Sequence, residues 1–147
     1  MTFLSTHNIL VTDFDGTLTR TDFFQAVLER LVDDKLAIWN SYCQGKITHF
    51  EALAGYYCQI RLAESQLRAL VSELGFPFNF DTLVKRLREN NWEVVIASAG
   101  CEWYINQLIH NSGIHPAPMV HANPGNYSPG TGLVMKLPKN SPHFHPE

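Results

Sequence analysis

The chain has 147 residues, of which 45% are hydrophobic and 17% charged, and its formal net charge is −3 at pH 7. This length and composition predict one compact domain with a hydrophobic core and exclude a largely disordered chain. The lysines and arginines are scattered rather than gathered in a basic stripe and no apolar run reaches the length of a membrane span, so we expect a small-molecule ligand and neither a nucleic-acid nor a membrane partner.

The first predicted element is a strand over the aliphatic run 8–11, whose continuous pattern is typical of a strand buried on both faces of a parallel sheet. Asp13 and Asp15 follow this run. Because side chains alternate along a strand, we expect both carboxylates to face one pocket at the carboxyl end of the sheet, where such sheets carry their chemistry. Gly16 allows the backbone to turn sharply directly after them. The stretch therefore predicts a reaction centre.

Two carboxylates at this spacing suit more than one kind of site. An EF-hand loop also begins with Asp-x-Asp, but counting from Asp13 places Leu18 where the glycine belongs and Phe24 where the bidentate glutamate belongs. That loop is therefore excluded. A magnesium site fits instead, in which Asp13 also acts as a nucleophile on phosphorus and Asp15 acts as acid and base.

Residues 22 to 75 predict helices without a clear strand between them. Thr21 or Asp22 can cap the first helix, and Thr48 with Glu51 matches a capping box at the start of the third. Apolar residues at helical spacing indicate four helices, which carry Phe23 to Val32, Leu36 to Cys43, Phe50 to Tyr57 and Leu67 to Leu74.

The remaining chain alternates helices with strands, in the order helix 81–90, strand 93–97, helix 101–111, strand 118–123 and a hairpin that ends at 133–135. The helix at 81–90 is amphipathic, and we expect Leu83, Val84 and Leu87 to face the core. The strand at 93–97 ends at Ser98-Ala99-Gly100, which places a hydroxyl and a glycine at the end of a buried strand.

The three cysteines, Cys43, Cys58 and Cys101, form no C-x-x-C pair, and their odd number does not suit a disulfide framework. The N-terminus also lacks the pattern of a secretory leader. Both observations favour a reducing compartment, and we expect a cytoplasmic protein.

Two of these stretches carry a family resemblance. Asp13-Phe14-Asp15-Gly16-Thr17-Leu18-Thr19 resembles the first motif of the haloacid dehalogenase (HAD) superfamily in its phosphatase form, and Ser98-Ala99-Gly100 resembles the second. The helical stretch between them is similar to the cap of the branch that includes phosphoserine phosphatase and the methionine-salvage phosphatases. The resemblance implies an α/β fold. A Rossmann-like parallel sheet core, formed by residues 1–21 and 76–147 and incomplete at about three strands plus a hairpin, would carry an inserted all-helical cap at 22–75.

The resemblance also implies an activity, which is magnesium-dependent hydrolysis of a small phosphorylated metabolite through an aspartyl-phosphate intermediate. Asp13 would be the nucleophile and Asp15 the acid and base, and both would contribute to the magnesium site. Ser98 would donate a hydrogen bond to the transferring phosphoryl group. The further residues expected to contact phosphate or substrate are Thr17, Asp22, Ala99 and Gly100. Helix capping explains Asp22 equally well.

Two further parts of the superfamily's site are not recognisable. These are a lysine that neutralises phosphoryl charge and a later acidic pair that completes the magnesium site. Lys136 and Lys139 are the late lysines, but Pro138 and Pro142 argue against the helical setting of the family's lysine. The resemblance therefore covers the N-terminal portion of the fold only. An alternative stays open, in which the chain is a truncated, catalytically inactive fragment or a phosphate-binding module.

The shortened core also has a structural consequence. In family members the strand that carries the first motif is central, whereas here it would lie at a sheet edge. An apolar edge strand invites pairing with another chain. We therefore expect a missing C-terminal segment, or a second copy in a homo-oligomer, to cover this edge.

Overall fold

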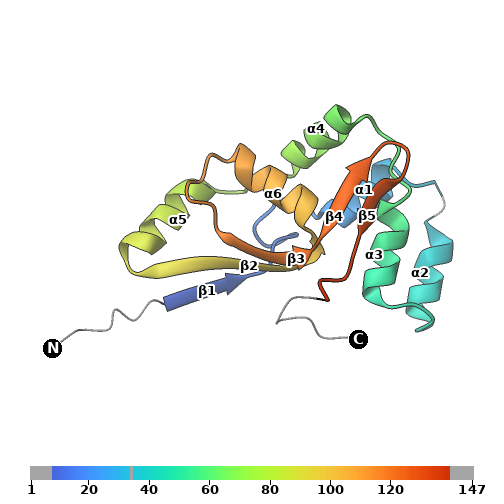
Figure 1. Ribbon diagram of the computed structural model, residues 1–147, viewed down its shortest axis with the longest axis horizontal. Helices are drawn as coiled ribbons and strands as arrows, with labels where there is room; N and C mark the ends of the chain where they lie inside the picture. Colours follow the sequence, from blue (N-terminus) through green and yellow to red (C-terminus); the bar gives the residue numbers. More distant parts are fainter. Residues whose placement is uncertain (1–7, 34, 140–147) are drawn as a thin grey trace.

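The structure, a computed structural model, describes residues 8–33 and 35–139, which form an α/β fold (Figure 1). The elements in chain order are β1 (Asn8–Thr12), α1 (Phe23–Arg30), α2 (Leu36–Cys43), α3 (His49–Tyr57), α4 (Glu64–Leu74), α5 (Phe80–Glu89), β2 (Trp92–Cys101), α6 (Glu102–Asn111), β3 (Met119–Asn123), β4 (Gly125–Ser128) and β5 (Gly132–Met135). The predicted fold class is confirmed, with a parallel three-stranded sheet and a separate two-stranded hairpin. No helix in the described ranges is long and apolar enough to cross a bilayer.

The parallel sheet has the strand order β1-β2-β3, so β1 lies at its edge, as predicted. The prediction that β1 is buried on both faces is wrong. Ile9 and Val11 are both 61% exposed, and Leu10 on the other face is 39% exposed. The reason is that, within the described part of the chain, β1 pairs with β2 alone, and a continuous aliphatic run does not reveal whether a second neighbour is present.

The two faces of the sheet differ in how well they are covered. Helix α5 packs on β2, and α6 packs on β2 and β3, which buries Val94 and Ile96 beneath them (Figure 1). On the opposite face, Val11 pairs in register with Val95, and Val95 pairs with Met119. Val11 and Met119 are exposed, so an apolar row crosses all three strands on this face.

The helices begin and end close to where their sequence patterns predict. Asp22 caps α1 by accepting the Phe24 N–H at 2.7 Å, and Thr48 forms the expected capping box with Glu51 at the start of α3. The prediction that Leu83 faces the core is wrong, because its side chain is 38% exposed. The rotation of α5 instead directs Phe80 and Val84, one turn apart, into the core.

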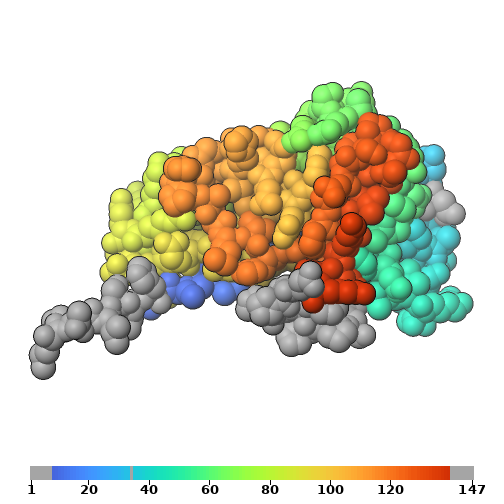
Figure 2. Space-filling view, in the orientation of Figure 1, coloured from blue at the N-terminus to red at the C-terminus, as the bar shows by residue number. Residues whose placement is uncertain are grey.

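The helical segment α1–α4 and the α/β segment share one continuous hydrophobic core. Helix α4 packs against α6, and the β4–β5 hairpin packs against α3, where Figure 2 shows the red hairpin against green helical residues. Tyr127 in β4 donates its hydroxyl to the Leu62 carbonyl at 2.5 Å. Gly132 in β5 has φ +76°, and a Cβ there would overlap the Cys58 carbonyl group. The division into a core and a cap at 22–75 stays a prediction.

Candidate active site

The carboxyl ends of the three parallel strands meet at one edge of the sheet. Asp13 follows β1 directly, Ser98 to Gly100 lie in the last residues of β2, and Asn123 ends β3. Strand β2 continues to Cys101, beyond its predicted end, and its register with β3 is irregular between Ala97 and Cys101. The Asn123 side-chain amide donates to the Ala99 carbonyl at 2.7 Å across this irregular stretch.

The turn after β1 sets the positions of the two aspartates. Strand β1 ends at Thr12, so the alternation expected from a continuing strand does not reach either carboxylate. The backbone N–H groups of residues 17, 18 and 19 all donate to the Phe14 carbonyl instead, which closes a tight turn. Gly16 has φ +69°, a conformation that favours glycine. The buried Thr19 hydroxyl accepts the Gly16 N–H at 3.0 Å and donates to the Thr21 carbonyl at 2.9 Å, which braces the turn from inside.

Asp13 is the exposed carboxylate of the pair. The Thr17 hydroxyl donates to Asp13 Oδ2 at 3.1 Å. This contact orients the carboxylate and leaves it open to solvent, which is the setting that a nucleophile needs in order to meet a soluble substrate.

Asp15 lies in a different environment, half-buried between the turn and two helices. Its Oδ1 accepts the Phe23 N–H at 3.0 Å, and its Oδ2 accepts the Tyr104 hydroxyl at 2.5 Å. Burial raises the pKa of Asp15 from its ordinary value of 3.8 to about 6, although both hydrogen bonds oppose this rise, and the charges of Asp22 and Asp13 add to it. A carboxyl with this pKa can both give and take a proton near neutral pH.

The second motif lies beside Asp15. Ser98 Oγ accepts the Gly100 N–H at 3.0 Å, which orients the serine so that its own hydroxyl hydrogen points elsewhere. Gly100 is buried, and a Cβ on it would lie 3.1 Å from Asp15 Oδ2. Ala99 is exposed. The structure therefore places Gly100 of the Ser98-Ala99-Gly100 stretch next to the Asp15 carboxylate.

The structure confirms helix capping for Asp22, since its carboxylate is bonded to the Phe24 N–H. Contact between Asp22 and a substrate stays a prediction. Its charge is near enough to raise the pKa of Asp15.

Tyr104 and Asn123 are site residues that sequence reasoning missed. Tyr104 falls inside the predicted helix 101–111 and Asn123 ends the predicted strand 118–123, and no local pattern identifies either residue as part of a site. Burial raises the pKa of the Tyr104 phenol well above its ordinary value of 10.0, so the phenol stays protonated and donates to Asp15.

The two aspartates offer oxygen donors of the kind that magnesium accepts. Mg²⁺ prefers oxygen ligands, keeps several waters, and is often held by one or two carboxylates together with substrate phosphate. The Asp13 carboxylate and the Asp15 main-chain carbonyl are the groups that would hold it. Over the ranges 8–33 and 35–139, no group of three or more His, Cys, Asp or Glu residues is arranged to hold a metal ion.

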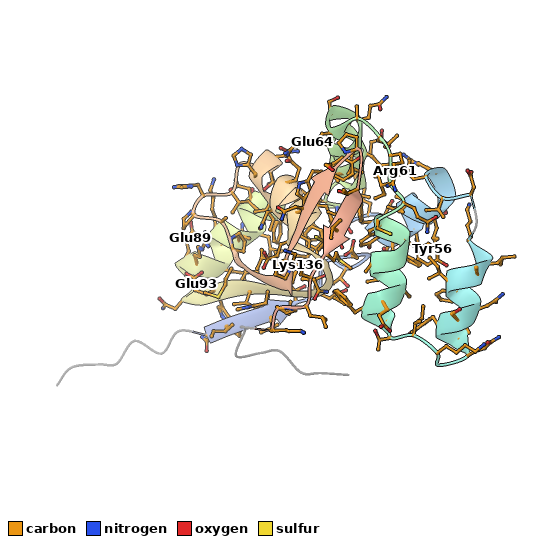
Figure 3. The ribbon with its side chains drawn as sticks, turned by 45° about the vertical axis from the view of Figure 1, so that its right-hand side comes forward. Tyr56, Arg61, Glu64, Glu89, Glu93 and Lys136 are labelled. Atoms are coloured by element: carbon orange, nitrogen blue, oxygen red, sulfur yellow. The ribbon has the colours of Figure 1, made fainter. Side chains whose placement is uncertain are left out.

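Two of the later acids, Glu89 and Glu93, lie away from the site. Glu89 ends α5 and Glu93 is the second residue of β2, so both lie toward the amino end of that strand, opposite the site (Figure 3). Lys136 follows β5, and its backbone N–H donates to the Pro124 carbonyl at 2.8 Å.

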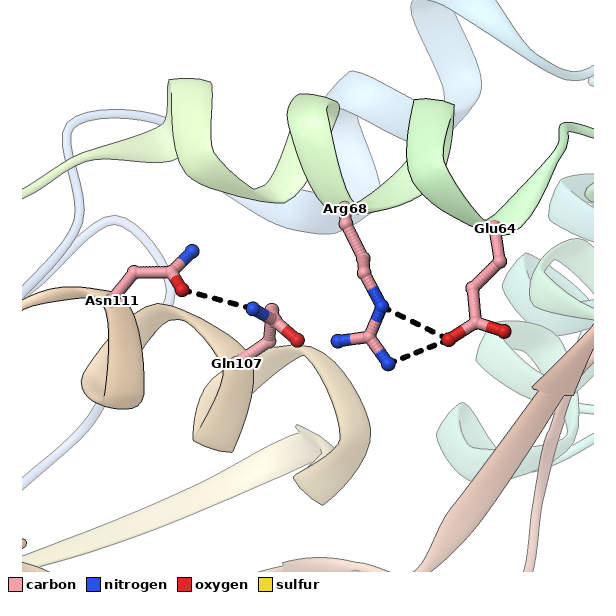
Figure 4. A network of polar contacts seen from close by, with 4 residues as sticks. All are labelled: Glu64, Arg68, Gln107 and Asn111. Atoms are coloured by element: carbon pink, nitrogen blue, oxygen red, sulfur yellow. Dashed lines mark hydrogen bonds and ion pairs between the residues drawn. The ribbon is translucent and has the colours of Figure 1, made fainter.

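A separate shallow groove of about 350 Å³ lies between α4, α6 and the start of β4. On its rim Arg68 binds Glu64 within α4, and Gln107 donates to Asn111 at 3.0 Å within α6 (Figure 4). The Arg68 guanidinium also lies 5.2 Å from the Trp103 ring centre. This contact and the hydrogen bond that Asn111 donates to the Ser72 hydroxyl at 3.0 Å join α6 to α4, so the groove is explained by the packing of the two helices.

Comparison with known proteins supports the fold through structure rather than sequence. No family model matches the sequence, and a search of curated proteins finds no match. Solved structures do resemble it, among them the following three. A HAD family hydrolase from Salmonella enterica serovar Typhi has a TM-score of 0.69 and 15% identity, over 89% of this chain and 45% of that one. A phospho-aspartyl intermediate analogue of phosphoserine phosphatase has a TM-score of 0.64 and 14% identity, over 90% of this chain and 65% of that one. A phosphoserine phosphohydrolase-like protein from Francisella tularensis has a TM-score of 0.62 and 19% identity, over 92% of this chain and 67% of that one.

At these identities the likeness shows the fold alone. The chain has a HAD-like Rossmann core, which confirms the resemblance at the level of architecture. It spans about half the length of the first of these structures and about two thirds of the other two.

Proposed function

We propose that this chain, which has the HAD-like fold, carries the nucleophile and the acid–base residue of a magnesium-dependent phosphatase that acts on a small phosphorylated metabolite. The observation that carries the proposal is the contrast between its two aspartates. Asp13 is exposed at the end of β1, whereas Asp15 is held by two donors and has a pKa of about 6. Similarity in fold to phosphoserine phosphatases supports the same reaction class.

The reaction proceeds in two displacements. In the first, Asp13 attacks phosphorus, the bond between phosphorus and the leaving oxygen breaks, and protonated Asp15 gives its proton to that oxygen. In the second, the Asp15 carboxylate takes a proton from water, and the resulting hydroxide attacks phosphorus and releases Asp13 and inorganic phosphate. Each residue ends in its starting state.

The phosphoryl group is received by the second motif. Ser98 accepts from Gly100, so its own hydroxyl hydrogen is directed toward another acceptor, and a phosphoryl oxygen is the partner that we propose. Thr17 keeps Asp13 oriented, and the backbone at Ala99 and Gly100 lines the phosphate position. When bound, magnesium would neutralise charge on the phosphoryl oxygens.

Hydrolysis of p-nitrophenyl phosphate in the presence of magnesium tests this function. We expect Asp13→Asn to abolish turnover, because an amide cannot attack phosphorus, while the matched variant Asp33→Asn, at an exposed aspartate outside the motif, keeps the wild-type rate. Equal rates for Asp13→Asn and wild type would refute the assignment of the nucleophile.

The second candidate is an inactive fragment or phosphate-binding module. It is favoured by the lack of a recognisable charge-neutralising lysine and of a completed cluster of metal ligands among the described residues. Calorimetry with inorganic phosphate distinguishes the two candidates. Binding without any turnover of p-nitrophenyl phosphate supports the module, and turnover excludes it.

We also propose that the β1 edge and the apolar row of Val11, Val95 and Met119 are covered by further polypeptide, either a C-terminal segment of a longer chain or a second copy. The exposure of Val11 and Met119 supports this proposal.

For the compartment we propose the cytoplasm. Cys43, Cys58 and Cys101 are free thiols, as expected in a reducing environment.

A further inference from the structure

Tyr104 of α6 reaches Asp15, which lies 89 residues earlier in the sequence, and donates its hydroxyl to Oδ2 at 2.5 Å. The tyrosine ring cannot move freely. It stacks on Phe23 of α1 with ring centres 4.1 Å apart, and the Tyr57 ring of α3 meets it edge-on at 6.3 Å. The ring is completely buried. Its hydroxyl is therefore presented to Asp15 from a fixed position.

Gly100 supplies the space for this contact. A Cβ at residue 100 would overlap the Tyr104 hydroxyl and would also crowd Asp15 Oδ2 at 3.1 Å. Gly100 does not have a positive φ, unlike Gly16 and four other glycines. Glycine is thus required here for the room that it leaves rather than for its backbone conformation.

The two donors together hold the whole carboxylate. The Phe23 N–H at 3.0 Å occupies Oδ1 while Tyr104 occupies Oδ2, and the two donors come from different helices. A carboxylate that is bonded through both oxygens keeps one side-chain rotamer. Loss of one donor leaves Asp15 free to rotate about its remaining contact.

We propose that Tyr104 is a positioning residue that fixes the Asp15 carboxylate where it exchanges protons, and that Gly100 is required because any side chain there would displace the tyrosine hydroxyl. This inference rests on the proposed phosphatase function for its catalytic consequence. The geometric part concerns Asp15 alone.

Nuclear magnetic resonance on the isolated chain tests the geometric part. Three-bond couplings of Asp15 report whether its side chain occupies one rotamer. We expect one rotamer in wild type and averaged couplings in Tyr104→Phe, which keeps the buried ring and removes only the hydroxyl. Tyr127→Phe is the matched control, because it also removes a tyrosine hydroxyl that donates a 2.5 Å hydrogen bond to a residue distant in sequence, the Leu62 carbonyl. A single Asp15 rotamer in Tyr104→Phe would overturn the proposal.

Gly100→Ala provides a second variant. The added methyl group should displace the hydroxyl and produce the same averaging of Asp15, even though Tyr104 is still present. Unchanged Asp15 couplings in folded Gly100→Ala would contradict the role given to the glycine.

Kinetics test the catalytic part. In Tyr104→Phe we expect kcat to fall at least about tenfold with KM nearly unchanged, which is the scale of one hydrogen bond to a charged group. If Asp15 averages but kcat does not fall, the positioning role is overturned. If wild type shows no turnover at all, the proposed function fails for this chain, and the coupling measurements still decide whether Tyr104 positions Asp15.

Discussion

At the scale of the residue, Asp13 and Asp15 show how two identical side chains acquire different chemistry. They lie two positions apart, yet one is exposed and the other is half-buried against Tyr104 and Phe23. Burial disfavours the charged carboxylate, and this effect outweighs the two hydrogen bonds that favour it, so the pKa of Asp15 rises to about 6. The two carboxylates are thus distinguished by their surroundings.

The raised pKa predicts how stability depends on pH. Folded Asp15 binds its proton more tightly than the unfolded chain does, since its pKa is about 6 instead of 3.8. Its contribution to stability is therefore fully present below about pH 4 and is lost as pH rises through about 6. A pKa rise of this size contributes at most about 3 kcal/mol to the free energy of unfolding.

Urea unfolding of wild type and Asp15→Asn across this range measures the effect. The free energy of unfolding of wild type should fall relative to that of the variant between about pH 4 and pH 7, because asparagine does not titrate. Parallel pH profiles for the two proteins would show that burial does not raise the pKa of Asp15.

At the scale of the element, the hairpin β4–β5 joins the α/β segment to the helical segment. Its close approach to α3 depends on Gly132, which has a positive φ and lies against the Cys58 carbonyl. Tyr127 adds a hydrogen bond to the Leu62 carbonyl on the same side. The hairpin thus ties the loop after α3 to the rest of the core.

Gly132→Ala should lower the free energy of unfolding by at least about 2 kcal/mol, because the methyl group adds both backbone strain and overlap with the Cys58 carbonyl. Gly130→Ala is the matched control in the same hairpin, since a Cβ at residue 130 meets nothing within 4 Å. Urea unfolding measures both variants. Equal losses would show that the hairpin does not approach α3 as closely as described.

At the scale of the whole molecule, the described residues cover the sheet on one face and leave the other open. Helices α5 and α6 bury Val94 and Ile96, whereas on the other face Val11 and Met119 are exposed on either side of Val95, and within residues 8–33 and 35–139 the outer edge of β1 pairs with no strand. An edge strand with exposed aliphatic side chains favours association with another chain. The described part of the molecule therefore presents an apolar surface that further polypeptide would stabilise.

Sedimentation velocity tests this surface. We expect the isolated chain to self-associate with rising concentration, and Val11→Lys with Met119→Lys to return it to the 16.7 kDa monomer. Leu36→Lys is the control, because Leu36 is also an exposed aliphatic residue but lies on α2 and not on the sheet. A wild-type chain that stays monomeric at every concentration, or a double variant that associates equally, would contradict this prediction.

The sequence by itself determined the features that depend on neighbouring residues. The capping box of Thr48 and Glu51, the start of α1 at Asp22 and the strand before Asp13 all follow from local periodicity and capping chemistry. Only the tertiary structure decided the contact between Tyr104 and Asp15, the pKa that burial gives Asp15, and the exposure of Ile9 and Val11. These features depend on which distant segments pack together, and a local pattern records the character of a side chain but not the neighbours that it meets.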